Sequence, residues 1–543
     1  VNALIEENEE LDLIEETLEE HGARWEDIGL PEGMIGLATW FAPADDGVGL
    51  APRTMFVIDF GDRAADVAGI IEDIAIDKER DGAIEMRETD LGDVTAITIS
   101  PIVEEAEEFE AENEWDDWEP PAGPETWLGL GWLLSETPPD FTFAQVDSYI
   151  VVANHVSVIE RVMDGVEGRL NDALAGEAAF AAAMGPLERP EAYQALFIRP
   201  MVEAAIAEDA VGVEVLPGVT LLNALRGLGL DGIRSFGFGV KLDGPDAMVE
   251  GRYAADMDRR EGIFALLEPI QGGFTPPPFV SADAAGVMML KFDFSRAPQA
   301  IQQAVTALPL EAREMIEPQL ALALPAATPL LQSIGPDVTI TDFYRQPFDP
   351  TSESSLITIA VKNAQVVSGM ITQYGAMAGV QSRDFEGNQI FEAPDAVGEE
   401  LVVGLGFGQA FIGPREVVEN AMRLAGAPNA LRMADDEDFR AAARLAAPAA
   451  EIYDYTAIEP GLRYMEWARN NIEQVLRSQM APFAGQIEDE VIDQWVEEAA
   501  AELRAGPQPP ATDVLARYLG EYVSDFRMTS QGFVGRVFLR EAK

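Results

Sequence analysis

The feature that most constrains the fold of this chain is an internal repeat. A short apolar segment, a helix-like stretch, a phenylalanine and a proline-ended segment occur twice, about 260 residues apart. A repeated segment of this length encodes the same supersecondary unit twice, so the sequence predicts two tandem copies of one fold. The matches are Ser157–Glu160 with Glu416–Glu419, Phe180 with Phe439, Ile198–Pro200 with Ile458–Pro460, Phe56–Ile58 with Leu356–Thr358, and Val249–Arg252 with Phe533–Arg536.

Each copy mixes helical and strand patterns in the same order. Apolar residues at helical spacing predict helices over 156–166 and 415–425, and alternating apolar residues predict terminal hairpins over 235–254 and 521–540. The predicted fold class is therefore α+β, with two repeats of a mixed, mainly antiparallel sheet plus helices, related by a pseudo-two-fold axis. Two long amphipathic helices, over 464–480 and 488–505, are predicted to pack into the core.

Glycine and proline set the predicted boundaries. The stretch 271–281 begins Gln-Gly-Gly-Phe-Thr-Pro-Pro-Pro and predicts a linker between a first repeat over 1–270 and a second over 282–543. Residues 103–121 form an acidic insertion in the first repeat, with only a short counterpart in the second. The second repeat opens with a strand pattern over 286–294 that the first lacks, which predicts a further strand before Val1.

The charge of the chain limits its partners. Asp and Glu outnumber Lys and Arg by 96 to 36, which gives a net charge of −60. Such a surface repels phosphate backbones, so nucleic acid is excluded as a partner. It suits high salt, where ions screen the repulsion, and so indicates a halophilic or marine protein. The alternative is an acidic cytoplasmic protein adapted to high internal salt.

Export is the expected route for this chain. Cysteine is absent, which excludes disulfides and thiolate chemistry, and no apolar run is long enough to span a membrane. The chain begins at Val1, which is explained by a signal peptide removed before that residue; the alternative is that the chain was shortened at this end. The expected location is extracytoplasmic, in the periplasm, the cell envelope or the cell surface.

A family resemblance supports this expectation. The Ala-Leu-Ala-Gly-Glu-Ala-Ala-Phe element at 173–180, followed by Tyr193 and Ile198–Pro200, resembles an uncharacterised family of exported bacterial proteins. The family is a domain of unknown function found mainly in planctomycetes and their relatives. The second copy carries the same element at 433–439, with Tyr453 behind it. The resemblance implies an extracytoplasmic location and a two-copy α+β fold, and it carries over no catalytic residues.

The motifs favour structure over catalysis. The two histidines, His21 and His155, are isolated and predict neither a zinc site nor a catalytic triad. Gly404–Gly408 follows a strand pattern, but its spacing does not fit a dinucleotide loop, and a further strand follows it. The remaining candidate is the acidic run within 103–121, interpreted as a solvated loop or as a Ca²⁺ site. Its candidate ligands are Glu112, Glu114, Asp116 and Asp117.

The sequence thus predicts a non-enzymatic, exported envelope or surface protein that acts by protein binding or self-assembly. No cofactor is expected other than Ca²⁺ at the acidic run. The alternative is a periplasmic carrier or chaperone for an apolar ligand such as a lipid or lipoprotein. A third class, a polysaccharide hydrolase, needs two opposed carboxylates in an open cleft, and no such pair can be singled out in so acidic a chain.

Overall fold

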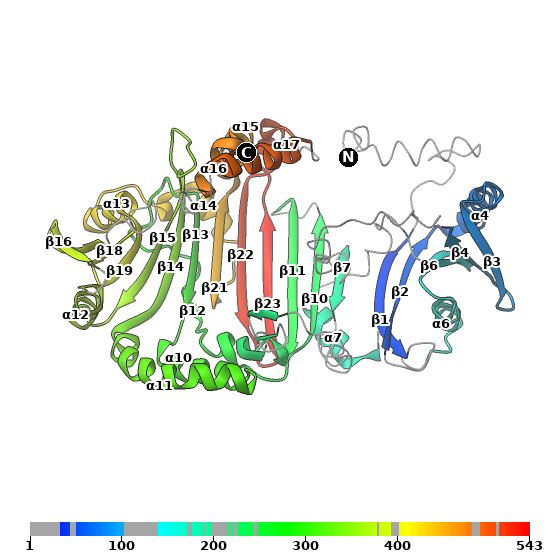
Figure 1. Ribbon diagram of the computed structural model, residues 1–543, viewed down its shortest axis with the longest axis horizontal. Helices are drawn as coiled ribbons and strands as arrows, with labels where there is room; N and C mark the ends of the chain where they lie inside the picture. The colour runs from blue at the N-terminus through cyan, green and yellow to red at the C-terminus, as the bar shows by residue number, and fades with distance from the viewer. Residues whose placement is uncertain are drawn as a thin grey trace. The chain divides into compact units, whose positions relative to one another are not determined.

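The structure is a computed structural model that forms two compact units, Val1–Glu177 and Ala178–Lys543. Each unit combines helices with antiparallel sheet, so the predicted α+β class is confirmed (Figure 1). The described residues are 33–43, 50–102, 140–170, 176–187, 191–196, 214–216, 219–220, 226–242, 247–376, 379–392, 401–480, 489–505 and 510–542.

The first unit contains a six-stranded sheet with a helix on each face. The strand order is β1-β2-β6-β5-β4-β3, and every neighbouring pair is antiparallel. Val158 and Ile159 of α6 pack with Val57 on one face, while Val67 of α4 packs with Ile150 on the other. The elements are β1 (Ile35–Pro43), β2 (Leu50–Asp59), α4 (Ala64–Arg80), β3 (Ile84–Asp90), β4 (Thr95–Pro101), β5 (Phe141–Val146), β6 (Tyr149–Ala153) and α6 (Val156–Val166).

The second unit is built on a 13-stranded sheet. Its order is β16-β17-β18-β19-β15-β14-β13-β21-β22-β23-β11-β10-β7, so β16 and β7 are its two edges (Figure 1). The strands are β7 (Ala192–Leu196), β10 (Ile233–Leu242), β11 (Val249–Met257), β13 (Gly286–Lys291), β14 (Ile334–Tyr344), β15 (Glu353–Val361), β16 (Gln381–Phe385), β17 (Asn388–Glu392), β18 (Leu401–Gly406), β19 (Gln409–Pro414), β21 (Ile452–Ala457), β22 (Glu521–Met528) and β23 (Gly532–Leu539).

Helices lie at both ends of these strands. In Figure 1, α10 and α11 run below the large sheet, and α15, α16 and α17 lie above it. The helix predicted over 464–480 is interrupted, because α15 ends at Asn470 and α16 begins at Ile472. α16 and α17 pack on each other through Leu476, Val496 and Ala500, in a small cluster of their own and not in the main core. The helices are α7 (Ala178–Met184), α10 (Ala297–Thr306), α11 (Leu310–Ser333), α12 (Ala364–Gly375), α13 (Arg415–Gly426), α14 (Glu437–Ala443), α15 (Ile458–Asn470), α16 (Ile472–Met480), α17 (Asp489–Ala505) and α18 (Thr512–Tyr518). The unit also contains short two- and three-residue strands: β8 (Glu214–Leu216), β9 (Val219–Thr220), β12 (Ile270–Gln271) and β20 (Ala449–Ala450).

The stretch 271–281 does not behave as an exposed linker. Phe274, Phe279 and Val280 are buried in the largest apolar cluster of the second unit. The Phe274 ring stacks on Tyr453 at 5.0 Å between centroids. The glycines and prolines of this stretch interrupt helix and strand, but the stretch still belongs to the core, because its three large apolar side chains are buried. The predicted copy boundary therefore lies inside one compact unit.

Helix α11 was not predicted from the sequence. It contains Pro318, Pro325 and Pro329, which normally end a helix, and it continues for 24 residues despite them. No Asp, Glu, Lys or Arg occurs from 318 to 336. α11 packs against α10 and α12, yet Leu322 is 80% exposed. Among the helices that the structure describes, none is long and apolar enough to cross a membrane.

The two halves of the chain share an order of strand pairing. The series β1-β2-β6-β5-β4-β3 has the same connections as β14-β15-β19-β18-β17-β16. Likewise, β7-β10-β11 follows the same order as β21-β22-β23. These orders support the predicted repeat; the repeat and its pseudo-two-fold axis remain predictions.

The strand registers shift one of the sequence matches by one residue. Val57 pairs with Val151 and packs under α6, while Thr358 pairs with Phe411, which lies in the cluster formed with α13. On β15 the corresponding face holds Leu356 and Thr358, so the packing favours one of these as the counterpart of Val57, whereas the sequence match placed it at Ile357. A one-residue slip moves every side chain of a strand to the other face, so this shift decides which residues correspond.

Candidate functional site on the large sheet

A row of polar side chains crosses the middle of the large sheet on one face. Gly286 of β13 lies opposite Asp342 of β14 on one side and Thr456 of β21 on the other. Asp454, two residues before Thr456, lies opposite Met288 and so shares the same face. Ser355, Tyr522 and Ser524 continue this face onto the flanking strands.

Asp342 and Asp454 are the central feature of this row, and we refer to them as the carboxylate pair. Burial and, to a smaller extent, the negative charge of Asp342 raise the pKa of Asp454 to about 6, against a smaller lowering by the backbone N–H of Tyr455. Asp342 Oδ1 accepts a hydrogen bond of 2.6 Å from the Ser355 hydroxyl. One member of the pair therefore changes its protonation near neutral pH.

Gly286 leaves the space between the strands open at this point. A Cβ atom added there would lie 3.4 Å from both Asp342 Oδ2 and Thr456 Oγ1, and 3.2 Å from the carbonyl oxygen of Tyr455. A larger side chain would press on the Asp342 carboxylate. The glycine thus lets polar side chains of the two flanking strands approach each other across β13.

Aromatic rings border the carboxylate pair at one end. Tyr344 lies two residues beyond Asp342 on β14, and its ring centroid is 5.4 Å from that of Tyr464 on α15. Tyr464 also contacts Phe348 at 5.9 Å and Trp467 at 5.8 Å. Burial raises the pKa of Tyr344, and the nearby Glu353 adds to the effect. Carboxylates beside aromatic rings can bind a cationic group, because both attract positive charge.

Aliphatic side chains border the pair at the other end. Met288 lies opposite Ile340, and Leu290 lies opposite Val338, on the same face as Asp454. Met288, Leu290 and Ile340 are only partly buried. This face therefore has an apolar surface next to two acidic side chains and an aromatic cluster.

A buried ion cluster occupies the opposite face and has a structural role. Asp525 Oδ2 accepts hydrogen bonds from Arg536 Nη2 at 2.6 Å and from the backbone N–H of Ala447 at 2.9 Å. Its Oδ1 lies 3.5 Å from Arg527 Nε without hydrogen-bond geometry. The Tyr453 hydroxyl donates to the Ala447 carbonyl at 2.8 Å. These contacts join β21, β22 and β23 to the segment around Ala447, which precedes β21.

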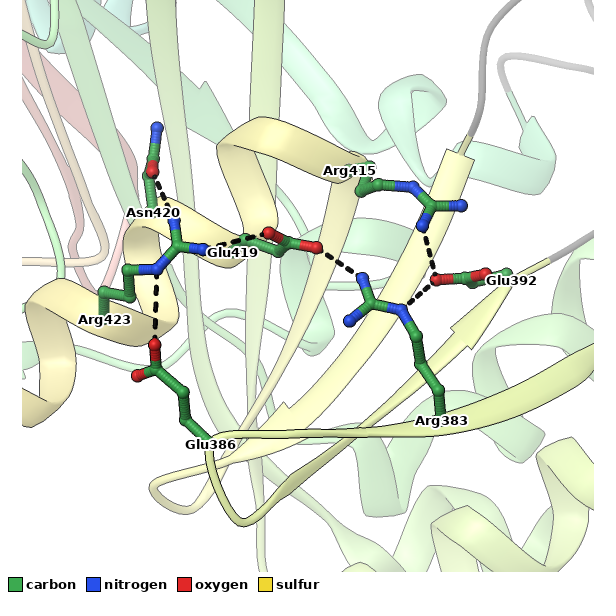
Figure 2. A network of polar contacts seen from close by, with 7 residues as sticks. All are labelled: Arg383, Glu386, Glu392, Arg415, Glu419, Asn420 and Arg423. Atoms are coloured by element: carbon green, nitrogen blue, oxygen red, sulfur yellow. Dashed lines mark hydrogen bonds and ion pairs between the residues drawn. The ribbon is translucent and has the colours of Figure 1, made fainter.

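A second ionic network ties a hairpin to a helix (Figure 2). Arg383 of β16 bonds to both Glu392 of β17 and Glu419 of α13. Arg415 Nη1 lies 3.0 Å from Glu392, and Arg423 Nη2 lies 3.1 Å from Glu419. Burial alone would raise the pKa of Glu392, but hydrogen bonds from Arg383 and Arg415 lower it below its usual value. The negative charges of the glutamates are paired with arginines inside the network, which indicates a structural role. Glu386 and Asn420 complete it through Arg423.

In the first unit, a small hollow of about 280 Å³ lies beside α6. The Arg161 guanidinium lies 5.8 Å from the Trp40 ring centroid, and Ser157 also lines the hollow. His155 Nδ1 lies 2.7 Å from Ser157 Oγ and accepts a 3.1 Å hydrogen bond from the Ser157 backbone N–H. This is the geometry of a helix N-cap, so His155 begins α6.

The predicted calcium ligands Glu112, Glu114, Asp116 and Asp117 lie outside the described residues, as does the whole of the 103–121 insertion. Within the described ranges, no group of three or more His, Cys, Asp or Glu side chains could hold a metal ion. The calcium site remains a prediction for the acidic run.

Comparisons with known proteins add no family. No protein-family model, curated protein or solved structure matches this chain.

Sequence reasoning did not single out the carboxylate pair. The signal was the sequence Tyr453-Asp454-Tyr455, in which an acidic residue alternates with two aromatic residues in a strand. Alternation predicts that Asp454 faces away from the tyrosines. It does not indicate that Asp342, more than a hundred residues earlier, lies two strands away on the same face.

Proposed function

We propose that this protein acts by binding another protein or further copies of itself, as an exported envelope or surface protein. The observation that carries the proposal is the exposed apolar surface of α11. Leu310 is 62% exposed, Met315 63% and Leu322 80%. Large apolar side chains gathered on one exposed helix are typical of protein contact surfaces.

The charge distribution supports the same proposal. A net charge of −60 makes most approaches between copies repulsive. The stretch 318–336 carries no charged residue and includes most of α11. Contact through Leu322 and the rest of this stretch would bury apolar area without pairing like charges, whereas the first turns of α11, which hold Leu310 and Met315, also carry Glu311, Glu314 and Glu317. The carboxylate pair, in turn, would favour a partner that offers a cationic group.

The test measures association of the full chain by size-exclusion chromatography with light scattering, at 0.1 M and at about 1 M salt, where screening is nearly complete. We expect association that strengthens with salt and weakens in Leu322→Glu. The matched control is Leu431→Glu, because Leu431 is equally exposed, at 79%, in the loop after α13.

Two results would contradict the proposal. One is a monomer at every salt concentration together with no co-purifying protein. The other is a lipid adduct in native mass spectrometry that survives in Leu322→Glu; this result would support the carrier alternative, for which the half-buried Met288, Leu290 and Ile340 offer an apolar field.

A further inference from the structure

The carboxylate pair carries negative charge that no basic side chain in the described ranges offsets. Burial and the charge of Asp342 raise the pKa of Asp454, so the two carboxylates lie close enough to repel each other. Asp342 accepts a hydrogen bond from the Ser355 hydroxyl, which leaves its charge in place. Within the described part of the chain, neither carboxylate forms an ion pair with an arginine or a lysine. A cation placed beside both would relieve their repulsion.

Other carboxylates on the same sheet have arginine partners. Asp525 of β22 lies 2.6 Å from Arg536, and Glu521 at the start of β22 lies 2.7 Å from Arg540. Partly buried charges are costly unless they are paired, which accounts for these arginines. The unmatched charge of the carboxylate pair, as far as the structure describes the chain, is complementary to a cationic group supplied by another molecule.

The shape of the face around the pair suits a cation on an aliphatic stem. Met288 lies opposite Asp454 on one side and Ile340 on the other. Ile357, opposite Ile340 on β15, is 38% exposed, so this part of the face is open to solvent. Two residues along a strand span about 6–7 Å, which the four-carbon stem of a lysine can cover. Gly286 has no side chain to separate a bound group from Asp342.

We propose that this face binds a lysine side chain of a partner protein, with the ammonium group between Asp342 and Asp454 and the stem over Met288 and Ile340. This inference rests on the proposed binding function and names the chemistry of one of its contacts. The ammonium group donates to both carboxylates, and the stem covers apolar surface. Lysine is favoured over arginine, because a compact ammonium donates in three directions, whereas a planar guanidinium matches a single carboxylate.

The probe is Nα-acetyl-lysine methylamide, titrated into the full chain with methyl-labelled methionine. The NMR signal of the Met288 methyl group, assigned with Met288→Leu, reports binding at this face alone. The titration is run at about pH 8, where Asp454 and the probe are both charged, and in about 0.5 M salt, which screens non-specific attraction to the acidic surface. We expect a saturable shift with a Kd of about 1 mM. Nα-acetyl-norleucine methylamide, which lacks the ammonium group, should bind at least about tenfold more weakly.

Variants of the protein test the role of the two carboxylates. Asp342→Asn and Asp454→Asn should each weaken binding of the lysine probe about tenfold. Asp337→Asn is the matched control and should leave binding unchanged. It removes the same charge from the same strand, five residues from Asp342 and therefore on the other face of the sheet. Circular dichroism checks that all three variants fold.

Three results would overturn the inference: no saturable shift of Met288, equal binding of the lysine and norleucine probes, or equal binding in Asp342→Asn and Asp337→Asn. Association and co-purification of the full chain are followed in parallel. If a protein partner or self-association is found while the lysine probe fails to bind, the lysine inference alone is removed. If the probe fails and no association is found, the binding function is removed as well.

Discussion

Arg252 lies directly opposite Arg536 in the ladder that joins β11 to β23. The internal sequence match aligns these same two residues. An antiparallel pair of strands has local two-fold symmetry about any facing pair, so equivalent residues meet at the centre of this ladder. Each arginine has its own acidic partner: Glu250 lies 2.8 Å from Arg252, and Asp525 lies 2.6 Å from Arg536. The arrangement supports a pseudo-two-fold axis through this ladder.

The two arginines should differ in their effect on stability. Arg536→Met leaves Asp525, whose side chain is fully buried, without its main partner, and should destabilise the second unit by about 3 kcal/mol. Arg252→Met breaks a partly exposed pair and should cost about 1 kcal/mol or less. Urea unfolding followed by fluorescence measures both. Equal losses would show that burial of Asp525 does not decide the effect.

Asp454 should make the second unit less stable as pH rises from 4 to 7. Its pKa is about 6 when folded, against 3.8 for an ordinary aspartate, so the folded state binds its proton more tightly. Stability from this group is full below pH 3.8 and is lost as pH rises through 6. Asp454→Asn should therefore be about 2 kcal/mol more stable than the native chain at pH 7 and nearly equal at pH 4. Melting temperatures across this range test the prediction, which fails if the gain is the same at both values.

Glu392 should show the opposite dependence on pH. Hydrogen bonds from Arg383 and Arg415 lower the pKa of Glu392 despite its burial. Ionised Glu392 therefore stabilises the fold at pH values above 4.5, its ordinary pKa, and this stabilisation is lost as the pH falls through its lowered pKa. Its side chain is 22% exposed, so Glu392→Gln should cost about 1 kcal/mol at pH 7 and less at pH 4. Glu386→Gln is the control, because Glu386 is 59% exposed and should change stability by less than about 0.5 kcal/mol. Chemical denaturation at the two pH values compares the three proteins.

Gly535 should not tolerate a side chain. A methyl group there would overlap the ring of Tyr253, which lies opposite it in β11. The ring cannot move freely, because it packs near Phe236, Phe526 and Phe533. Gly535→Ala should destabilise the second unit by about 2 kcal/mol, as expected for an overpacked core. Gly36→Ala on β1 is the control, since its nearest neighbour is a methionine methyl group 3.7 Å away. Calorimetry that shows equal melting temperatures for the two variants would contradict this packing argument.

Much of the secondary structure could be predicted from local patterns. The helices predicted over 156–166 and 415–425 match α6 and α13 within one residue. Apolar residues at helical spacing and nearby capping residues are local signals, so they are visible in the sequence. Helix α11 was missed because Pro318, Pro325 and Pro329 predict breaks, while its packing against α10 and α12 is not a local signal.

The sequence by itself determined the α+β class, the identity of most elements and a polyanionic surface with an uncharged stretch at 318–336. Tertiary structure alone decided that β11 lies beside β23, that Asp342 and Asp454 share one face, and that 271–281 contributes to a core. The physical reason is that strand pairing joins segments hundreds of residues apart. Burial, and with it the pKa of Asp454, depends on which strand becomes the neighbour.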